Sequence, residues 1–289
     1  MSDTDIDSTR ASAVFGIGMP TKEAIRRVLT KVGAGKSGGR QLVWTSLREE
    51  PVLYVNGRPY VLRLFQDPMK NLEATGIARE RVEMMEMQMK RDAVRELRKY
   101  EGRLLLHEEH ADGSGFSIVP VWETVREEDV QTPLEVYQQV QGEGYRVDYL
   151  RIPVTDEQAP IPDVFDQLVE RMTRVTGSTD VMFNCQMGRG RTTTGMVITC
   201  LMEMIVGNSA ILESAFLTDD DDDDDYHHFA AGDTEESIRA RYLDGEYKVI
   251  LQLIAALAHG KLSKRLTDRA IDACHHMQNL RSAIYDYKL

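Results

Sequence analysis

The chain has 289 residues, enough to bury a substantial core, and its 47 acidic and 35 basic side chains give a formal net charge of −12 at pH 7. Nucleic-acid binding depends on clustered Lys and Arg, so this balance argues against that class and requires any anion site to be local. Three cysteines, at positions 185, 200 and 274, are too few for a disulfide scaffold. We expect no leader peptide and no membrane span, because no apolar run approaches the roughly 20 residues that a span needs. These features predict a cytoplasmic protein.

The first third of the chain predicts a helix followed by strands. Residues 1–14 are polar and without periodicity, and they are predicted to be a disordered tail. Thr21 is expected to cap a helix that contains AIRRVLTKV and ends at Gly33. LVWTSL is predicted to be a buried strand. PVLYVNGRPYVLRLF is predicted to be a hairpin, because Asn56-Gly57 suits a tight two-residue turn.

The next part of the chain alternates between helical and strand patterns. Residues 74–100 predict a helix that leads into the strand RLLLH, and FSIVPVWETV is predicted to be a further strand or edge segment. A helix over TPLEVYQQV, a strand over YRVDYLRIPV, a helix over 162–175, the strand DVMFNC and an apolar helix over 192–206 follow. This alternation predicts an α/β fold with a central, mainly parallel sheet flanked by helices on both faces.

Residues 207–236 break the alternation with seven consecutive aspartates, 219–225, followed by two histidines. A solvated acidic insertion loop is the simplest interpretation; a cation site and a polyanion mimic that occupies the active site are the alternatives. Helices resume with YKVILQLIAALAHG, and no motif recurs along the chain. Residues 15–289 are therefore predicted to form one domain with an acidic insertion.

The stretch FNCQMGRGRTTTG, residues 183–195, lies between a predicted strand and a predicted helix. Backbone N–H groups of a tight loop at a helix N-terminus form a nest for an anion, and the helix dipole favours negative charge there. The same positive field lowers the pKa of a thiol, so Cys185 is predicted to be a nucleophilic thiolate. Arg191 can grip two phosphate oxygens, and Thr192 can hydrogen-bond the sulfur. The remaining loop positions are predicted to bind substrate: Gln186, Met187, Gly188, Arg189 and Gly190.

A phosphate ester with a poor alkoxide leaving group needs an acid, and Asp156 is the predicted one. Strand 145–154, a helix and strand 180–184 form a crossover unit that brings the carboxyl ends of both strands to one edge of the sheet. Asp156 and Cys185 both follow those ends, so Asp156 is placed to act first as acid and then as base. Three other carboxylates compete for the role: Glu157, Asp163 and Asp166.

The same edge should collect the residues that follow the other predicted parallel strands. Arg48, with Glu49 and Glu50, follows LVWTSL, and His107, with Glu108, follows RLLLH. Arg48 and His107 are predicted to contact substrate. Ordinary surface charge or ion pairing is the alternative for all five residues.

CQMGRGRT with its upstream aspartate loop resembles the cysteine-dependent phosphatase superfamily. Longer stretches narrow this to paladin-like repeats and, more distantly, protein-tyrosine-phosphatase-like phytases: FGIGMPTKEAIRRVL, SLREEPVLYVNGRPYVLR, LLLHEE, FNCQMGRGRTTTGMV and HHMQNLR. The resemblance covers nearly the whole chain from Phe15. It implies a parallel sheet flanked by helices, Cys185 as nucleophile, Arg191 as phosphate clamp, Thr192 as loop support and Asp156 as acid. Phosphorylated inositols are the implied substrate class, and their hydrolysis is expected to pass through a phosphocysteine intermediate.

Further cations fit a substrate with several phosphates. Arg189 adds a second guanidinium inside the loop, although it could instead be an outward-facing solubilising residue. Four cations from the last part of the chain are candidates for a basic rim: Lys248, Lys261, Lys264 and Arg265. Contact with lipid headgroups is possible for such a protein, whereas stable membrane insertion is not expected.

Two departures from the resemblance leave alternatives open. Asn184 stands where the superfamily usually has histidine, and this chain has one repeat where paladin-like proteins tend to have several. A protein tyrosine or dual-specificity phosphatase and a weakly catalytic module that binds phosphorylated ligands are the alternative functions. GAGKSGG lacks the first glycine of a nucleotide-binding loop, and the paired histidines lack metal-ligand spacing, so no cofactor or metal is expected.

Overall fold

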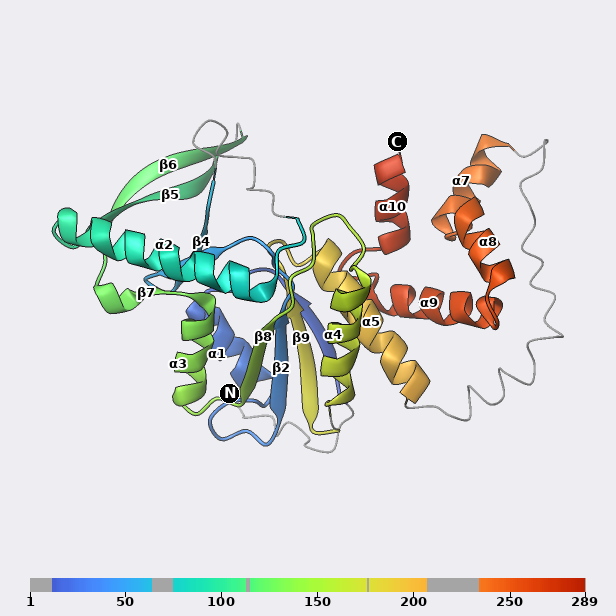
Figure 1. Cartoon of the computed structure of the whole chain (residues 1–289), viewed down its shortest axis with the longest axis horizontal. Helices are drawn as coiled ribbons and strands as arrows, with labels where there is room; N and C mark the ends of the chain where they lie inside the picture. The colour runs from blue at the N-terminus through green and yellow to red at the C-terminus, as the bar shows by residue number, and fades with distance from the viewer. Residues whose placement is uncertain (1–11, 64–74, 113–114, 176, 207–233, 289) are drawn as a thin grey trace.

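The computed structural model describes residues 12–63, 75–112, 115–175, 177–206 and 234–288 (Figure 1). The described strands are β1 (Val14–Ile17), β2 (Gln41–Ser46), β3 (Val52–Val55), β4 (Arg58–Val61), β5 (Arg103–Asp112), β6 (Gly115–Thr124), β7 (Val130–Gln131), β8 (Val147–Arg151) and β9 (Thr179–Asn184). The described α-helices are α1 (Lys22–Lys31), α2 (Arg79–Lys99), α3 (Pro133–Gly142), α4 (Pro162–Thr173), α5 (Gly190–Val206), α7 (Glu235–Leu243), α8 (Lys248–Ala256), α9 (Gly260–Cys274) and α10 (Leu280–Lys288).

A four-stranded sheet in the order β1-β9-β2-β8, with all neighbours parallel, forms the centre of the fold. Alternate side chains of its strands enter two different cores. Trp44 and Met182 pack with α1 and α3 on one face, whereas Val43 and Phe183 pack with α4, α5 and α9 on the other. Figure 1 shows these helices on either side of the sheet. The predicted α/β fold, a parallel sheet flanked by helices, is confirmed.

Several local predictions near the N-terminus are confirmed. The Thr21 side chain accepts a hydrogen bond from the Ala24 N–H and caps α1. Asn56 and Gly57, with φ of 50° and 75°, form the turn between β3 and β4, as a two-residue hairpin requires. The predicted tail is outside the described residues up to position 11, but Val14 already belongs to β1. That edge strand is too short for its pattern to be recognised in the sequence.

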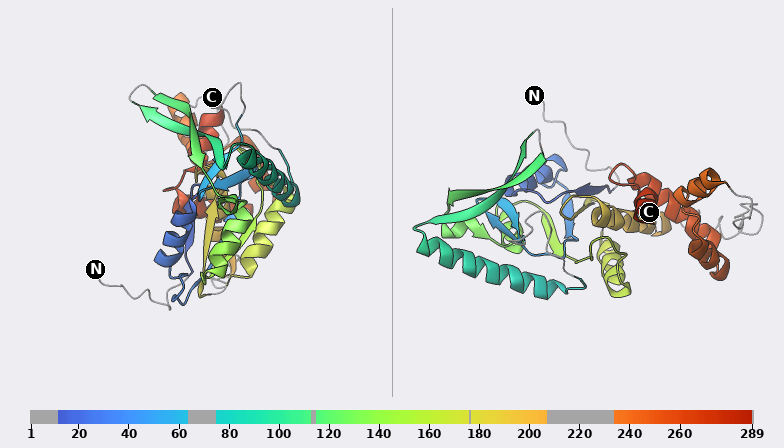
Figure 2. Two further views of the ribbon diagram at one scale, coloured as in Figure 1. Left: turned by 90° about the vertical axis from the view of Figure 1, so that its left-hand side faces the viewer. Right: turned by 90° about the horizontal axis from the view of Figure 1, so that it is seen from above.

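The prediction that RLLLH joins the parallel sheet is wrong. β5 pairs antiparallel with β6 in a separate two-stranded sheet, and His107 pairs with Pro120 within that ladder. The two strands are separated by two residues, and a parallel connection needs a dozen or more, so only a hairpin is possible. Figure 2 shows this hairpin and α2 on one side of the central sheet, with the C-terminal helices on the other.

The C-terminal helices continue the α5 side of the fold. α9 packs against α5 through Ala270 and Cys274, which share a core with Met196. Thr234 caps α7, so the predicted insertion of 207–236 extends two residues into a helix, while its aspartate run lies outside the described residues. Within the described ranges, no helix is both long and apolar enough to cross a membrane.

Candidate active site

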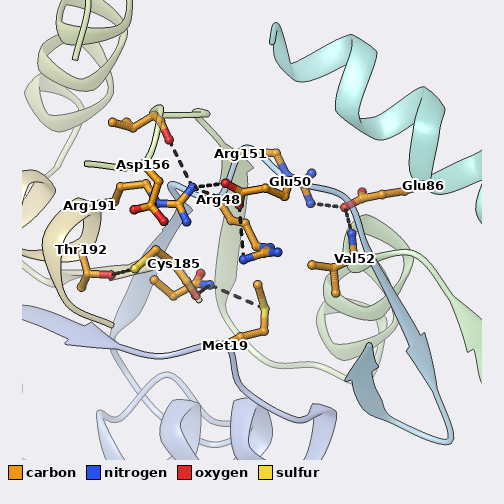
Figure 3. Close-up of polar contacts among 12 residues, drawn as sticks. Met19, Arg48, Glu50, Val52, Glu86, Arg151, Asp156, Cys185, Arg191 and Thr192 are labelled. Carbon is orange, nitrogen blue, oxygen red and sulfur yellow. Dashed lines mark hydrogen bonds and ion pairs between the residues drawn. The ribbon is translucent and has the colours of Figure 1, made fainter. Parts of the chain in front are cut away.

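The cysteine loop joins β9 to α5 at the carboxyl edge of the central sheet. Asn184 is the last residue of β9, Cys185 follows it, and α5 begins at Gly190. Cys185 is only 4% exposed, and the Thr192 hydroxyl donates a hydrogen bond to its Sγ over 3.1 Å (Figure 3). The sulfur therefore accepts a hydrogen bond beside the N-terminus of α5. The structure thus brings Cys185 and Thr192 together as expected.

Gly188 is the position at which the loop requires glycine. Its φ is 73°, and a Cβ at this position would lie 2.5 Å from the backbone N of Gly18 and 2.6 Å from the carbonyl carbon of Ile17. The loop is also tied to this neighbouring segment, because the Met19 N–H donates to the Gln186 carbonyl over 2.9 Å. The residues that follow β1 therefore pack against the loop, a contact that the sequence did not indicate.

We expect Gly188→Ala to lower the free energy of unfolding by more than about 2 kcal/mol, since a left-handed conformation alone costs about 1–2 kcal/mol and the new methyl meets backbone. Gly190→Ala is the matched control. A Cβ there meets only the Gln278 Oε1, at the ordinary distance of 3.7 Å. Urea denaturation of both variants measures the difference; equal losses would contradict this account of the loop.

Arg191 is buried and held by one of its terminal nitrogens. Its Nη1 donates to both carboxylate oxygens of Glu50, at 3.0 and 3.1 Å, and to the Val154 carbonyl at 3.3 Å. Nε and Nη2 make no aligned hydrogen bond with any described residue. The Nε–Nη2 edge is the one that a guanidinium offers to a phosphate in a two-pronged contact. Glu50 therefore fixes the arginine by the nitrogen that phosphate does not need.

Asp156 lies at that edge. Its Oδ1 forms an ion pair with the Arg191 Nε at 3.2 Å, while 56% of its side chain is exposed. The next residue, Glu157, has a φ of 58°, so the chain turns sharply just after the carboxylate. Of the competing carboxylates, Asp163 and Asp166 are exposed on α4. Of these four carboxylates, all in the described part of the chain, only Asp156 contacts Arg191.

Arg48 is a second buried cation beside the loop. It is 2% exposed, and its Nη1 lies 3.3 Å from the Oε2 of Glu50, so Glu50 bridges Arg48 and Arg191. The pKa of the Arg48 guanidinium is lowered to about 10, mainly by burial and to a smaller extent by Arg191 and Arg151, whereas Glu50 and Cys185 oppose the shift. Arg48 thus keeps its charge at neutral pH and is attracted electrostatically to Cys185.

Asn184, which stands at the usual histidine position, makes defined contacts. Its Oδ1 accepts a hydrogen bond from the Trp44 Nε1 over 2.9 Å, and its Nδ2 donates to the Cys185 carbonyl over 3.3 Å. A neutral amide therefore holds the backbone of the nucleophile. Unlike a histidine, this amide does not change its charge between pH 5 and 8. Sequence reasoning identified Asn184 as a departure but could not find Trp44, which is 140 residues away.

Several predicted binding residues lie apart from these contacts. His107 is in the β5–β6 hairpin and Lys248 begins α8, on the outer side of the C-terminal helices (Figure 1). Lys264 is engaged by the Asp268 carboxylate. Neither His107 nor Lys248 follows a strand of the central sheet, so the edge argument does not apply to them. Arg189 and Met187 are on the loop and exposed.

Gln278 lies beside the first residue of α5, a placement that the sequence did not indicate. Its Oε1 is buried without a hydrogen-bond partner and lies 3.7 Å from where a Cβ on Gly190 would be. The signal was its place in HHMQNLR, a motif to which the sequence assigned no chemistry. Across the described residues, no group of three or more His, Cys, Asp or Glu side chains is arranged to hold a metal.

Comparisons with known proteins show which proteins this chain resembles. Human paladin is 27% identical over 263 residues, and the match covers 90% of this chain but 26% of paladin, so the chain spans about a quarter of that relative. The PTP-like myo-inositol phosphatase of Mitsuokella multacida, solved with myo-inositol-(1,3,4,5)-tetrakisphosphate, superposes with a TM-score of 0.50 at 14% identity, covering 94% of this chain and 40% of that one.

A tandemly repeated protein tyrosine phosphatase like phytase from the same organism superposes with a TM-score of 0.51 at 13% identity, covering 99% of this chain and 42% of that chain. At these identities the likeness shows the fold. Residues 45–203 match the model of the PTP-like phytase family, whose description is "Inositol hexakisphosphate". That match includes the last two residues of β2, Arg48, Asp156 and the whole cysteine loop, and it supports a phosphatase. The chain belongs to the PTP-like phytase family.

Proposed function

We propose that this protein hydrolyses phosphate monoesters of phosphorylated inositols through a phosphocysteine intermediate. The observation that carries the proposal is the arrangement of Cys185 with its sulfur hydrogen-bonded to Thr192, the open Nε–Nη2 edge of Arg191, and Asp156 at that edge. A nucleophile, a clamp for the transferring group and an acid are the three parts that phosphoryl transfer through cysteine needs.

In the first step the Cys185 thiolate attacks phosphorus. A P–S bond forms, the P–O bond to the inositol oxygen breaks, and Asp156 gives its proton to the departing oxygen. Arg191 and the loop N–H groups stabilise the charge on the three other phosphoryl oxygens. In the second step Asp156 takes a proton from water as the water attacks phosphorus. The P–S bond breaks, and inorganic phosphate and the thiolate are released.

Family membership and the charge of the loop support inositol phosphates as the substrate class. Arg189 is exposed next to the clamp and makes no ion pair with any described residue. A second guanidinium can bind a further phosphate on a ring that carries several. On a monophosphate it would have no second phosphate to bind.

We expect phosphate release from inositol hexakisphosphate and short-chain phosphoinositides, with a kcat/KM at least about tenfold higher than for a phosphotyrosine peptide. Asp156→Asn should lower kcat on the inositol substrates by about 100-fold or more, the usual contribution of a general acid. Malachite-green detection of released phosphate measures both. Preference for the peptide would indicate a protein phosphatase, and binding without release a phospho-ligand-binding module.

A further inference from the structure

Glu49 and Glu50 are adjacent, buried and directed at different partners. Glu50 accepts hydrogen bonds from the Nη1 of Arg191 and pairs with Arg48. Glu49, 1% exposed, accepts instead from the Ile77 N–H over 2.9 Å and from the Thr155 hydroxyl over 3.3 Å. One carboxylate therefore faces the phosphate clamp, and the other faces the residue just before Asp156.

Thr155 is fixed from two sides. Its hydroxyl donates to Glu49 and accepts from the Gly76 N–H over 3.2 Å. Gly76 and Ile77 lie just before Ala78, the N-cap of α2, so Glu49 and Thr155 tie the Asp156 loop to the segment that leads into that helix. The preceding residue, Val154, is also held, since its N–H donates to the Leu47 carbonyl over 3.1 Å. The backbone is anchored up to the residue that precedes the acid.

Asp156 itself has much weaker support. More than half of its side chain is exposed, and the contact that orients it is the ion pair with the Arg191 Nε. A bound phosphate would take the Nε–Nη2 edge, because Glu50 and the Val154 carbonyl already hold Nη1 and phosphate can replace Asp156 at Nε. The ion pair would then be lost at the moment when Asp156 has to deliver a proton. The Thr155–Glu49 anchor does not use Arg191 and remains in place.

We propose that Glu49 is a positioning residue that, through Thr155, holds the Asp156 loop for proton transfer, whereas Glu50 orients Arg191 for phosphate binding. This role rests on the proposed function and goes beyond it, because it assigns support of proton transfer and support of phosphate binding to two neighbouring carboxylates. Loss of the Glu49 anchor impairs protonation of the leaving group and leaves the phosphate clamp intact. The resulting loss of activity depends on how much the leaving group of the substrate needs an acid.

The test compares kcat/KM, which reports the steps up to formation of the phosphoenzyme, for inositol hexakisphosphate and p-nitrophenyl phosphate. The inositol alkoxide needs a proton and nitrophenolate hardly does. Glu49→Leu and Thr155→Val should each lower kcat/KM about 10- to 100-fold for the inositol substrate and less than about threefold for the aryl substrate, a fraction of the general-acid contribution. Combining them should add little, since they break the same contact.

Conservative variants separate positioning from loss of folding. Glu49→Gln keeps a carbonyl acceptor and Thr155→Ser keeps the hydroxyl, so both should recover most of the activity on inositol hexakisphosphate. Glu50→Leu is the contrasting variant and should lower kcat/KM for both substrates, because Arg191 serves both.

Equal losses on both substrates for Glu49→Leu and Thr155→Val, or no loss on either, would overturn the inference while leaving the proposed function intact. Absence of turnover of both substrates by the parent protein would overturn the proposed function and this inference with it.

Discussion

Replacing Cys185 with serine is expected to abolish phosphate release, with a fall in kcat of about 10⁴-fold or more, which corresponds to a barrier higher by ~5 kcal/mol. The Thr192 hydroxyl donates a hydrogen bond to the Cys185 sulfur, close to the start of α5. A serine hydroxyl has a far higher pKa than a thiol, so this surrounding cannot convert it to the anion that attacks phosphorus. Serine is close to cysteine in size, and the loop should keep its shape.

Binding should survive the same change. Arg191 and the loop N–H groups hold the phosphate, and neither depends on the sulfur. Cys185→Ser should therefore bind inositol hexakisphosphate in calorimetry with an affinity within about tenfold of the parent, and no phosphoenzyme should be found after acid quenching with radiolabelled substrate. Cys200→Ser is the control, since Cys200 contacts Cys274 between α5 and α9 rather than the loop. Retained turnover in Cys185→Ser would contradict the phosphocysteine mechanism.

Spacing along the chain is enough to position the parts of the site that are local in sequence. The cysteine loop lies within thirteen residues, so its glycines, arginine and threonine could be located by spacing alone. Thr192 does donate to the Cys185 sulfur, and Arg191 does turn into the site. Asp156 was placed by topology, because two parallel strands must end at the same edge of a sheet.

Contacts between distant segments were not predictable in the same way. Whether RLLLH joins the central sheet depends on which strand pairs with it, and its own alternation does not contain that information. From the sequence, Glu49 and Glu50 could only be placed together at the edge of the sheet, with no difference in role between them. Their division between Thr155 and Arg191 arises from segments more than 100 residues away, whose side-chain directions no sequence pattern specifies.

Arg151→Met is expected to cause the largest loss of stability, about 3–5 kcal/mol, because it leaves a buried carboxylate without its cation. The Arg151 Nη2 donates to the Glu86 Oε1 over 2.6 Å, and both side chains are 1% exposed (Figure 3). The same oxygen accepts from the Val52 N–H over 3.0 Å, so Glu86 joins α2 to β3 and β8. Urea denaturation of the parent and the variant measures the difference.

Two companion variants test this reason. Arg151→Met combined with Glu86→Leu removes both charges and should recover most of the loss, since replacing a buried pair by apolar residues is often neutral. Arg174→Met, which breaks the exposed pair with Glu170, should cost less than about 1 kcal/mol. A double variant as unstable as Arg151→Met would mean that packing of the Arg151 side chain, rather than the unpaired charge, sets the cost.

The loss in Arg151→Met should also depend on pH. Burial raises the pKa of Glu86 above its usual value, with a smaller contribution from Glu83, and Arg151 is the main opposing influence. Without Arg151 the pKa of Glu86 in the folded state rises further, while its pKa in the unfolded chain stays at about 4.3. The folded variant then binds a proton that the unfolded chain releases. Its deficit relative to the parent is therefore full above the folded pKa and shrinks as the pH falls through it. A deficit of equal size on both sides of that pKa would show that Glu86 is not the group left uncompensated.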